Sequence, residues 1–168
     1  MIIRLIFTII FFLAASNCAY AEYPDYLRGD TNFILCGGHM GYGEYVDKSS
    51  LVVQEYNPPI YRIAVNVLSV PDADRGKTQV KSVKTKYFKY DWDNRRMYTI
   101  WPSDNLFHYI SPVGSMAETG HFFAGEMAFY IAYHLKFYGG QKWYHTKSGK
   151  YLSVNWGDSL YKRVDYSE

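Results

Sequence analysis

A run of basic and aromatic residues in the middle of the chain has the residue types of a binding site. It covers residues 81–96 and contains no acidic residue before Asp91. Lysine and arginine bind anionic groups, and flat aromatic rings stack on sugars or bases. The candidate binding residues are Lys84, Lys86, Tyr90, Trp92, Arg95 and Arg96. The alternative is that Lys84 and Lys86 form the solvated face of a strand that protects a sheet edge.

A second candidate chemistry is nucleophilic catalysis by Cys36. His39 follows three residues later, so a thiol and an imidazole lie close in the sequence. Two glycines separate them, and no third residue that would orient the imidazole can be identified. A lone cysteine is more often a small buried hydrophobic residue. We therefore expect no catalytic residue, and a small enzyme that uses Cys36 or a histidine cluster is the less favoured alternative.

Two aspartate-rich segments, residues 72–76 and 91–94, resemble the first positions of a calcium loop. The twelfth position of such a loop is a glutamate that binds through both oxygens, yet it is Val83 in one segment and Pro102 in the other. Aspartate and asparagine side chains also cap turns of their own backbone. The five histidines show no metal-binding spacing. We expect turns at these segments, and no metal or cofactor.

The elements that position these residues are predicted to be strands between residues 31 and 110, because apolar and polar residues alternate there. In the clearest strand, residues 61–69, the odd-numbered side chains from Tyr61 to Val67 share one face. Residues 80–90 continue the alternation, which predicts Lys84 and Lys86 on the solvated face, opposite Val83. A polar turn is predicted at residues 47–50.

The period changes near the C-terminal part of the chain. Apolar residues at helical spacing predict a buried helix over residues 125–138, with Ile131 and Leu135 on its packed face and a stop at the following glycine pair. Gly120 is expected to limit any earlier helix to one turn. Residues 143–154 suggest a hairpin. The predicted fold is α+β, an antiparallel meander of five or six strands with one long C-terminal helix packed on one face.

The first 21 residues have the pattern of a secretory signal peptide. Arg4 precedes an apolar run, and the small residues Ala19 and Ala21 mark a cleavage site. We expect one domain over residues 22–168 that is secreted, periplasmic or on the cell surface, with no transmembrane segment after cleavage. Cys18 falls within the leader, so Cys36 is the only cysteine left and no disulfide is expected. The formal net charge of +2 gives no global attraction to nucleic acid.

The order of several short segments resembles the surface-adhesin protein E family. The matching segments are residues 45–51, the strand that begins at Tyr61, residues 80–91, residues 94–96 and residues 112–115. The resemblance covers about residues 42–138 and implies a small envelope or surface protein that binds host or matrix components. The cysteine of the family's turn is replaced by Trp92, and no cysteine follows the helix, so the family's disulfide has no counterpart here.

The sequence is compatible with three functions. We expect first a non-enzymatic, adhesin-like binding module whose partner is an extracellular matrix component, a glycan or another surface ligand, and not nucleic acid. A structural envelope protein without a soluble ligand is the second, and the small enzyme is the third. A binding module predicts an exposed aromatic or basic patch, whereas an enzyme predicts a pocket into which Cys36 or two histidines converge.

Overall fold

The computed structural model describes residues 22–112, 116–145, 148–153 and 159–167. The predicted leader lies outside these ranges. None of the helices in the described ranges has both the length and the apolar character needed to cross a membrane. The elements in chain order are η1 (Leu27–Gly29), β1 (Phe33–His39), β2 (Tyr42–Asn57), β3 (Ile60–Val70), η2 (Ala73–Arg75), β4 (Ser82–Asp91), β5 (Arg96–Ile100), β6 (Phe107–Ile110), α2 (Met116–Tyr133), β7 (Lys142–His145), β8 (Lys150–Ser153) and α3 (Ser159–Asp165).

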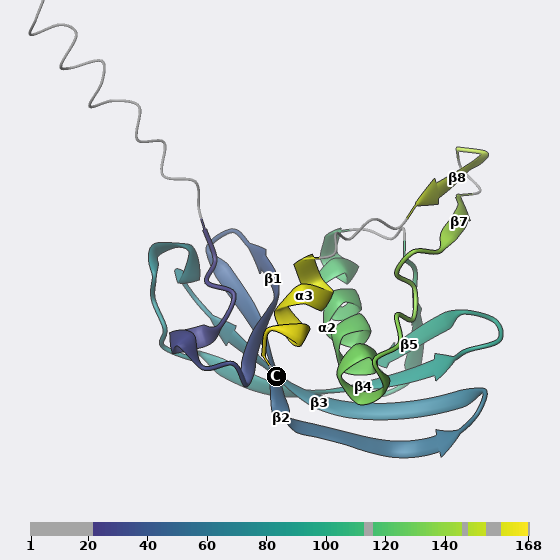
Figure 1. The fold of residues 1–168 in the computed structure, drawn as a ribbon, viewed down its shortest axis with the longest axis horizontal. Helices are drawn as coiled ribbons and strands as arrows, with labels where there is room; N and C mark the ends of the chain where they lie inside the picture. The colour runs from purple at the N-terminus through teal and green to yellow at the C-terminus, as the bar shows by residue number, and fades with distance from the viewer. Residues whose placement is uncertain (1–21, 113–115, 146–147, 154–158, 168) are drawn as a thin grey trace, which may run out of the picture.

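Strands β1 to β6 form one antiparallel sheet in which each strand pairs with its neighbour in the sequence. The sheet curls into a half-barrel, with α2 along its concave side and α3 beside β1 (Figure 1). This confirms the α+β meander that the alternation predicted. The short helix α3 is an addition, because its seven residues gave too weak a periodic signal to be recognised.

Strand β2 continues through the segment for which a turn was predicted, so that prediction is wrong. Asp47 pairs with Asn66 and Val52 with Ala64, so residues 48–51 bulge out of the ladder. The Asp47 carboxylate accepts hydrogen bonds from the backbone and hydroxyl of Ser49, at 3.1 and 2.6 Å. The polar residues therefore stabilise a bulge within one long strand instead of ending it.

The register of β3 and β4 decides where the candidate lysines lie. Ile63, Val65 and Val67 are buried on the concave face, as the alternation predicted. Val65 pairs with Lys86 and Val67 with Lys84, so both lysines lie on this inner face. Lys84 is exposed, as predicted, and Lys86 is half-buried, but the predicted placement of both lysines on the outer face is wrong, because the buried rings that follow them on β4 fix the same face inward.

Helix α2 begins nine residues earlier and ends five residues earlier than predicted. It passes through Gly120, which was expected to limit an earlier helix to one turn, and through Gly125, the predicted first residue of the helix. A Cβ at Gly125 would lie 2.9 Å from the ring of Phe88, so glycine there allows the helix to approach the sheet closely. The helix ends at Tyr133 and is followed by His134, whose φ of 52° is left-handed. Leu135 therefore follows the helix and is exposed rather than buried.

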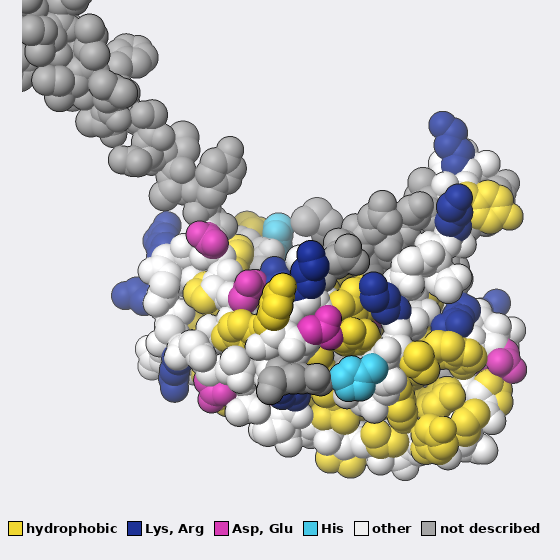
Figure 2. Space-filling model, viewed as in Figure 1, with side chains coloured by type: hydrophobic (Ala, Val, Ile, Leu, Met, Phe, Trp, Pro, Cys, Tyr) yellow, Lys and Arg dark blue, Asp and Glu magenta, His cyan; other side chains and the backbone are white. Residues whose placement is uncertain are grey.

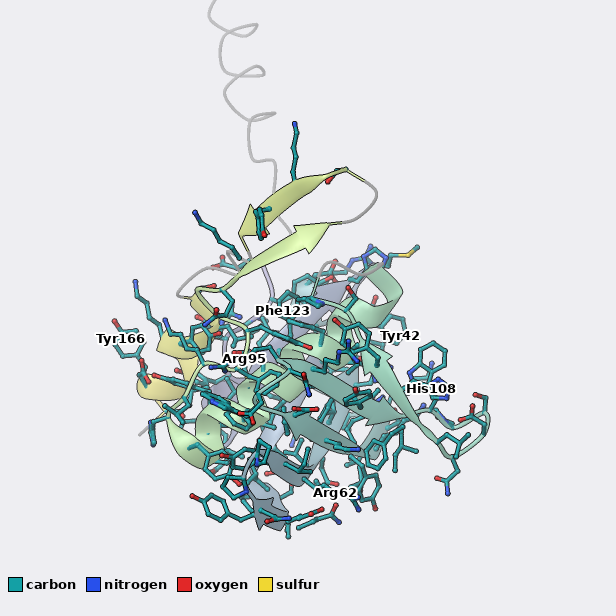
Figure 3. The ribbon with its side chains drawn as sticks, turned by 90° about the vertical axis from the view of Figure 1, so that its right-hand side faces the viewer. Tyr42, Arg62, Arg95, His108, Phe123 and Tyr166 are labelled. Carbon is teal, nitrogen blue, oxygen red and sulfur yellow. The ribbon has the colours of Figure 1, made fainter. Side chains whose placement is uncertain are left out.

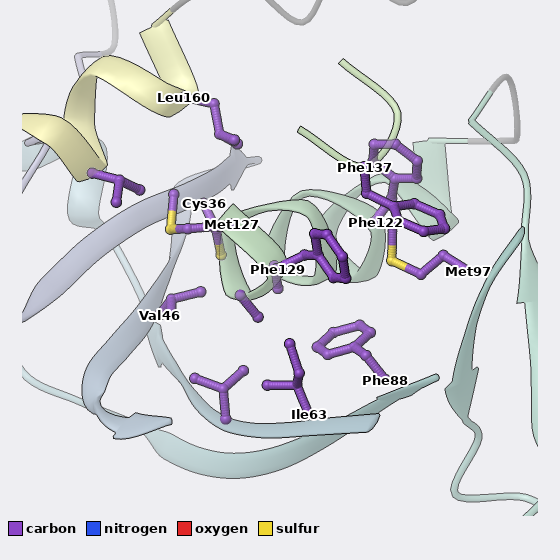
Figure 4. Packing of buried hydrophobic residues seen from close by; sticks show 14 of the residues in the cluster. Cys36, Val46, Ile63, Phe88, Met97, Phe122, Met127, Phe129, Phe137 and Leu160 are labelled. Carbon is purple, nitrogen blue, oxygen red and sulfur yellow. The ribbon is translucent and has the colours of Figure 1, made fainter. Parts of the chain in front are cut away.

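The core fills the space between the concave face and the two helices. It contains side chains from β1 to β6, α2 and α3, among them Cys36, Phe88 and Phe129 (Figure 4). Ile131, predicted to be in the core, is partly buried at its edge. The pair β7 and β8 forms the hairpin suggested by the sequence and projects from the body (Figures 1 and 3).

One carboxylate lies inside this core. Glu126 on α2 is fully buried, and its oxygens accept hydrogen bonds from the backbone N–H groups of Phe137 at 2.7 Å, Tyr138 at 3.0 Å and Gly139 at 3.4 Å. The hydroxyl of Tyr161 on α3 donates a fourth, at 2.7 Å. The Glu126 side chain therefore joins α2, the segment after it and α3.

Candidate functional site

The six predicted binding residues do not form one site. Lys84 and Lys86 lie at one end of the concave face, and Trp92 and Arg95 lie near the other, roughly 25 Å away along β4 at about 3.3 Å per residue. Tyr90 is fully buried and donates a hydrogen bond to the Gly125 carbonyl at 2.7 Å, so its ring belongs to the core. Arg96 is exposed on the outer face, paired with Asp91.

The polar end, as we call the first region, consists of Lys84, Lys86 and His121, with Glu44 nearby on β2. The Nζ atom of half-buried Lys86 lies 3.1 Å from Nδ1 of His121 on α2. Because an ammonium group only donates, His121 accepts at Nδ1 and carries its proton on Nε2. The curl of the sheet and the inward face of β4 bring these groups together under the first half of α2.

Burial and the two lysines act together on His121. Its pKa is lowered to about 4, first by burial and then by the positive charges of Lys86 and Lys84. Burial also lowers the pKa of Lys86, and Glu44 partly offsets this effect. Within the described part of the chain, neither lysine forms an ion pair. The polar end therefore presents two ammonium groups and a neutral imidazole, which suits an oxyanion.

Cys36 is not part of a nucleophile–base pair. Its thiol is buried and donates to the Glu44 carbonyl at 3.2 Å, whereas His39 is exposed. Burial raises the pKa of this thiol, which disfavours the reactive thiolate. A pocket of about 270 Å³ does reach Cys36, and its lining, which contains no histidine, consists of Leu35, Cys36, Gly37, Gly38, Phe123, Ser159, Leu160 and Arg163.

The second region, the aromatic end, lies where β2, β3 and β4 reach the C-terminal part of α2. Trp92 stacks on Phe129, with ring centroids 5.6 Å apart and an interplanar angle of 19°. The Arg95 guanidinium lies 3.5 Å from the centroid of Trp92 and donates to the Phe137 carbonyl at 3.1 Å. Trp92 and Arg95 therefore pack against the core. The Arg95 guanidinium covers the Trp92 ring in a cation–π contact.

Three tyrosines complete the aromatic end. Tyr56 is 68 % exposed, and its ring centroid lies 5.6 Å from that of Tyr61 and 5.9 Å from that of Tyr133. Hydrophobic side chains gather over this end of the sheet, while basic side chains are scattered over the visible face (Figure 2). The aromatic patch expected of a binding module is thus present, but most of its rings differ from those predicted.

Sequence reasoning missed His121, Tyr56, Tyr61 and Tyr133. The adjacent prolines after Tyr56 and Asn57 mark the hairpin that exposes the Tyr56 ring, so that residue had a signal. No signal in the sequence indicates the approach of His121 to Lys86, because that approach depends on the curl of the sheet. Among the described residues, no three His, Cys, Asp or Glu side chains are placed to hold a metal ion. The aspartates at residues 91–94 form the expected turn, in which Asp91 accepts hydrogen bonds from Asn94.

Comparison with protein-family models, with curated proteins and with solved structures finds no match.

Proposed function

We propose that this protein is a non-enzymatic binding module of the cell envelope or extracellular space, and that its polar end binds an anionic group of a glycan or matrix component. The observation that carries the proposal is the contact of Lys86 with His121, with Lys84 two residues away on the same inner face and neither lysine in an ion pair among the described residues. The secretory pattern of residues 1–21 supports the location.

The energetics of Lys86 support a binding role. Removing a cation from water costs free energy unless a charged partner replaces the lost hydration. Lys86 is half-buried, and its hydrogen-bond partner is a neutral imidazole that supplies no charge. An incoming oxyanion would supply that charge and accept from both lysines. His121 would then donate its Nε2–H or keep its acceptor contact with Lys86.

Binding is favoured over catalysis because the polar end has charge but no activated nucleophile. Cys36 donates to a carbonyl instead of to an imidazole, and its pKa is raised. An adhesin-like role agrees with the family resemblance of residues 42–138, which implies a surface protein that binds host or matrix components.

The test compares two double variants with equal loss of charge. Lys84→Gln/Lys86→Gln removes two charges from the inner face of the sheet. Lys89→Gln/Arg96→Gln removes two charges from nearby positions on the outer face. We expect the first to weaken binding to a heparin decasaccharide about tenfold or more, and the second to change it little. Wild-type affinity should fall as salt increases. Equal losses in both variants, or none in the first, would rule out the polar end.

A further inference from the structure

The aromatic end holds a group of three tyrosines that the proposed anion site does not use. We call Tyr56, Tyr61 and Tyr133 the tyrosine platform, and we propose that it is a second binding site, for a neutral saccharide. The proposal does not depend on the polar end, because the platform lies near the opposite end of the inner face. It rests on the geometry of the rings, on one unpartnered hydroxyl and on the charge of the surroundings.

The rings of the platform are fixed but not enclosed. Tyr61 meets Tyr56 edge to face, with ring planes at 74°, and meets Tyr133 with planes at 60° and centroids 5.3 Å apart. Tyr61 also packs on Phe129 in the core, at 5.5 Å. The ring of Tyr56 is thereby supported from beneath while it remains 68 % exposed. A supported, solvent-facing aromatic ring is the surface on which the C–H face of a sugar ring packs.

The hydroxyl of Tyr133 is the second observation. Its Oη atom is buried and has no hydrogen-bond partner among the described residues. Buried tyrosine hydroxyls normally find a partner, since an unsatisfied one loses its hydrogen bonds to water without replacement. The Tyr133 ring lies 5.9 Å from the exposed ring of Tyr56, so a ligand packed on Tyr56 lies next to the Tyr133 side chain. A sugar hydroxyl would then supply the missing hydrogen bond.

The charges around the platform select a neutral, hydroxyl-rich occupant. The pKa of the Tyr61 phenol is raised by burial, then by Tyr56 and by the negative charge of Asp93, so a carboxylate faces the platform. Arg95, the basic group of this end, is occupied by Trp92 and the Phe137 carbonyl. Asp93 repels anions and accepts hydrogen bonds from hydroxyl groups. The edge-to-face rings present one open ring face rather than the groove that holds a proline-rich peptide.

The experiment uses the purified protein and a panel of neutral hexasaccharides: cellohexaose, maltohexaose and chitohexaose. We expect at least one to bind, with its C–H protons receiving saturation from aromatic protons in a saturation-transfer NMR measurement. Tyr56→Ala should weaken that binding about tenfold, whereas Tyr166→Ala, at a tyrosine that directly follows α3 and is 77 % exposed, should not. Binding should be insensitive to salt and unchanged in Lys84→Gln/Lys86→Gln, which separates this site from the polar end.

Tyr133→Phe provides the sharper test, because it removes only the unpartnered hydroxyl. We expect it to weaken saccharide binding about two- to tenfold while the melting temperature stays the same or rises. A lower melting temperature would mean that the hydroxyl already has a partner, and it would overturn the proposal. The proposal is also overturned if none of the three hexasaccharides binds at millimolar concentration, or if a proline-rich peptide binds the platform and they do not.

Discussion

Lys86 and Glu126 are both ionisable side chains on the concave side of the sheet, but the protein surrounds them in opposite ways. The Glu126 carboxylate receives hydrogen bonds from three backbone N–H groups and the Tyr161 hydroxyl. Among the residues that the structure describes, the Lys86 ammonium has one hydrogen-bond partner, the neutral imidazole of His121. The difference shows how to distinguish a polar group that holds the fold from one that is left available. A group that is satisfied internally has no capacity left for a ligand, whereas Lys86 retains most of its donor capacity.

Removing the Glu126 carboxylate should have the largest effect in the molecule. Glu126→Ala leaves several buried donors without an acceptor, so we expect a loss of about 3–5 kcal/mol in the free energy of unfolding. Equilibrium unfolding in urea measures it. The matched control is Glu55→Ala, which breaks the exposed ion pair with Arg62 and should cost at most about 1 kcal/mol. Similar losses in both variants would remove the distinction between the two regions.

The pH dependence of stability tests the environment of His121 at the polar end. The pKa of His121 is about 4 in the folded protein, whereas an unfolded histidine titrates near its ordinary value of 6.5. Between these values the unfolded state binds more protons, so stability is lost as pH falls through this window. Lys84 and Lys86 face the imidazole, and Glu44 acts on Lys86.

We expect His121→Asn to reduce this acid destabilisation by about 1 kcal/mol after solvent screening. Urea unfolding across the window, for wild type and variant, gives the difference, in which the titration of other groups cancels. His39→Asn, at an exposed histidine, is the control. The interpretation fails if His121→Asn leaves the pH profile of wild type intact.

The smallest effect is expected from Lys86→Met, and its sign is informative. Methionine keeps the unbranched chain as far as Cε and removes a charge that is only half hydrated, so stability should be unchanged or higher by up to about 1 kcal/mol. Binding of the heparin decasaccharide should weaken at the same time. Thermal unfolding of Lys86→Met and of Lys89→Met, on the outer face, gives the comparison. A clear loss of stability in Lys86→Met would mean that Lys86 serves the fold.

The sequence was sufficient for the alternation of β3 and for the existence of α2, because both are local patterns. It could not give the face of Lys84 and Lys86, since a lysine near the open end of an inner face has the same local pattern as one on a solvated face. The start of α2 was predicted too late for a related reason. Gly125 lies inside the helix because it allows a close approach to Phe88, a residue on another element, and no local rule distinguishes that role from a helix start.

For the candidate site, too, the sequence indicated what depends on local patterns and not what depends on contacts between elements. The residue types in segment 81–96 indicated a basic and aromatic surface. Which of these side chains lie together depends on strand register and on the curl of the sheet. The segment therefore contributes some residues to the polar end and others to the aromatic end. The environment of Glu126 was inaccessible for a simpler reason: three of its four partners are backbone N–H groups, which every residue except proline possesses.

The Glu126 contacts have a consequence for amide hydrogen exchange. The N–H groups of Phe137, Tyr138 and Gly139 lie outside any helix or strand, where amides usually exchange rapidly with solvent. Here each is directed at a buried carboxylate that also holds α3 through Tyr161, so their exchange requires that residues 137–139 separate from Glu126 in the core. These three amides therefore report, residue by residue, on whether the C-terminal part of the chain is docked, and they should exchange at the rate of core opening.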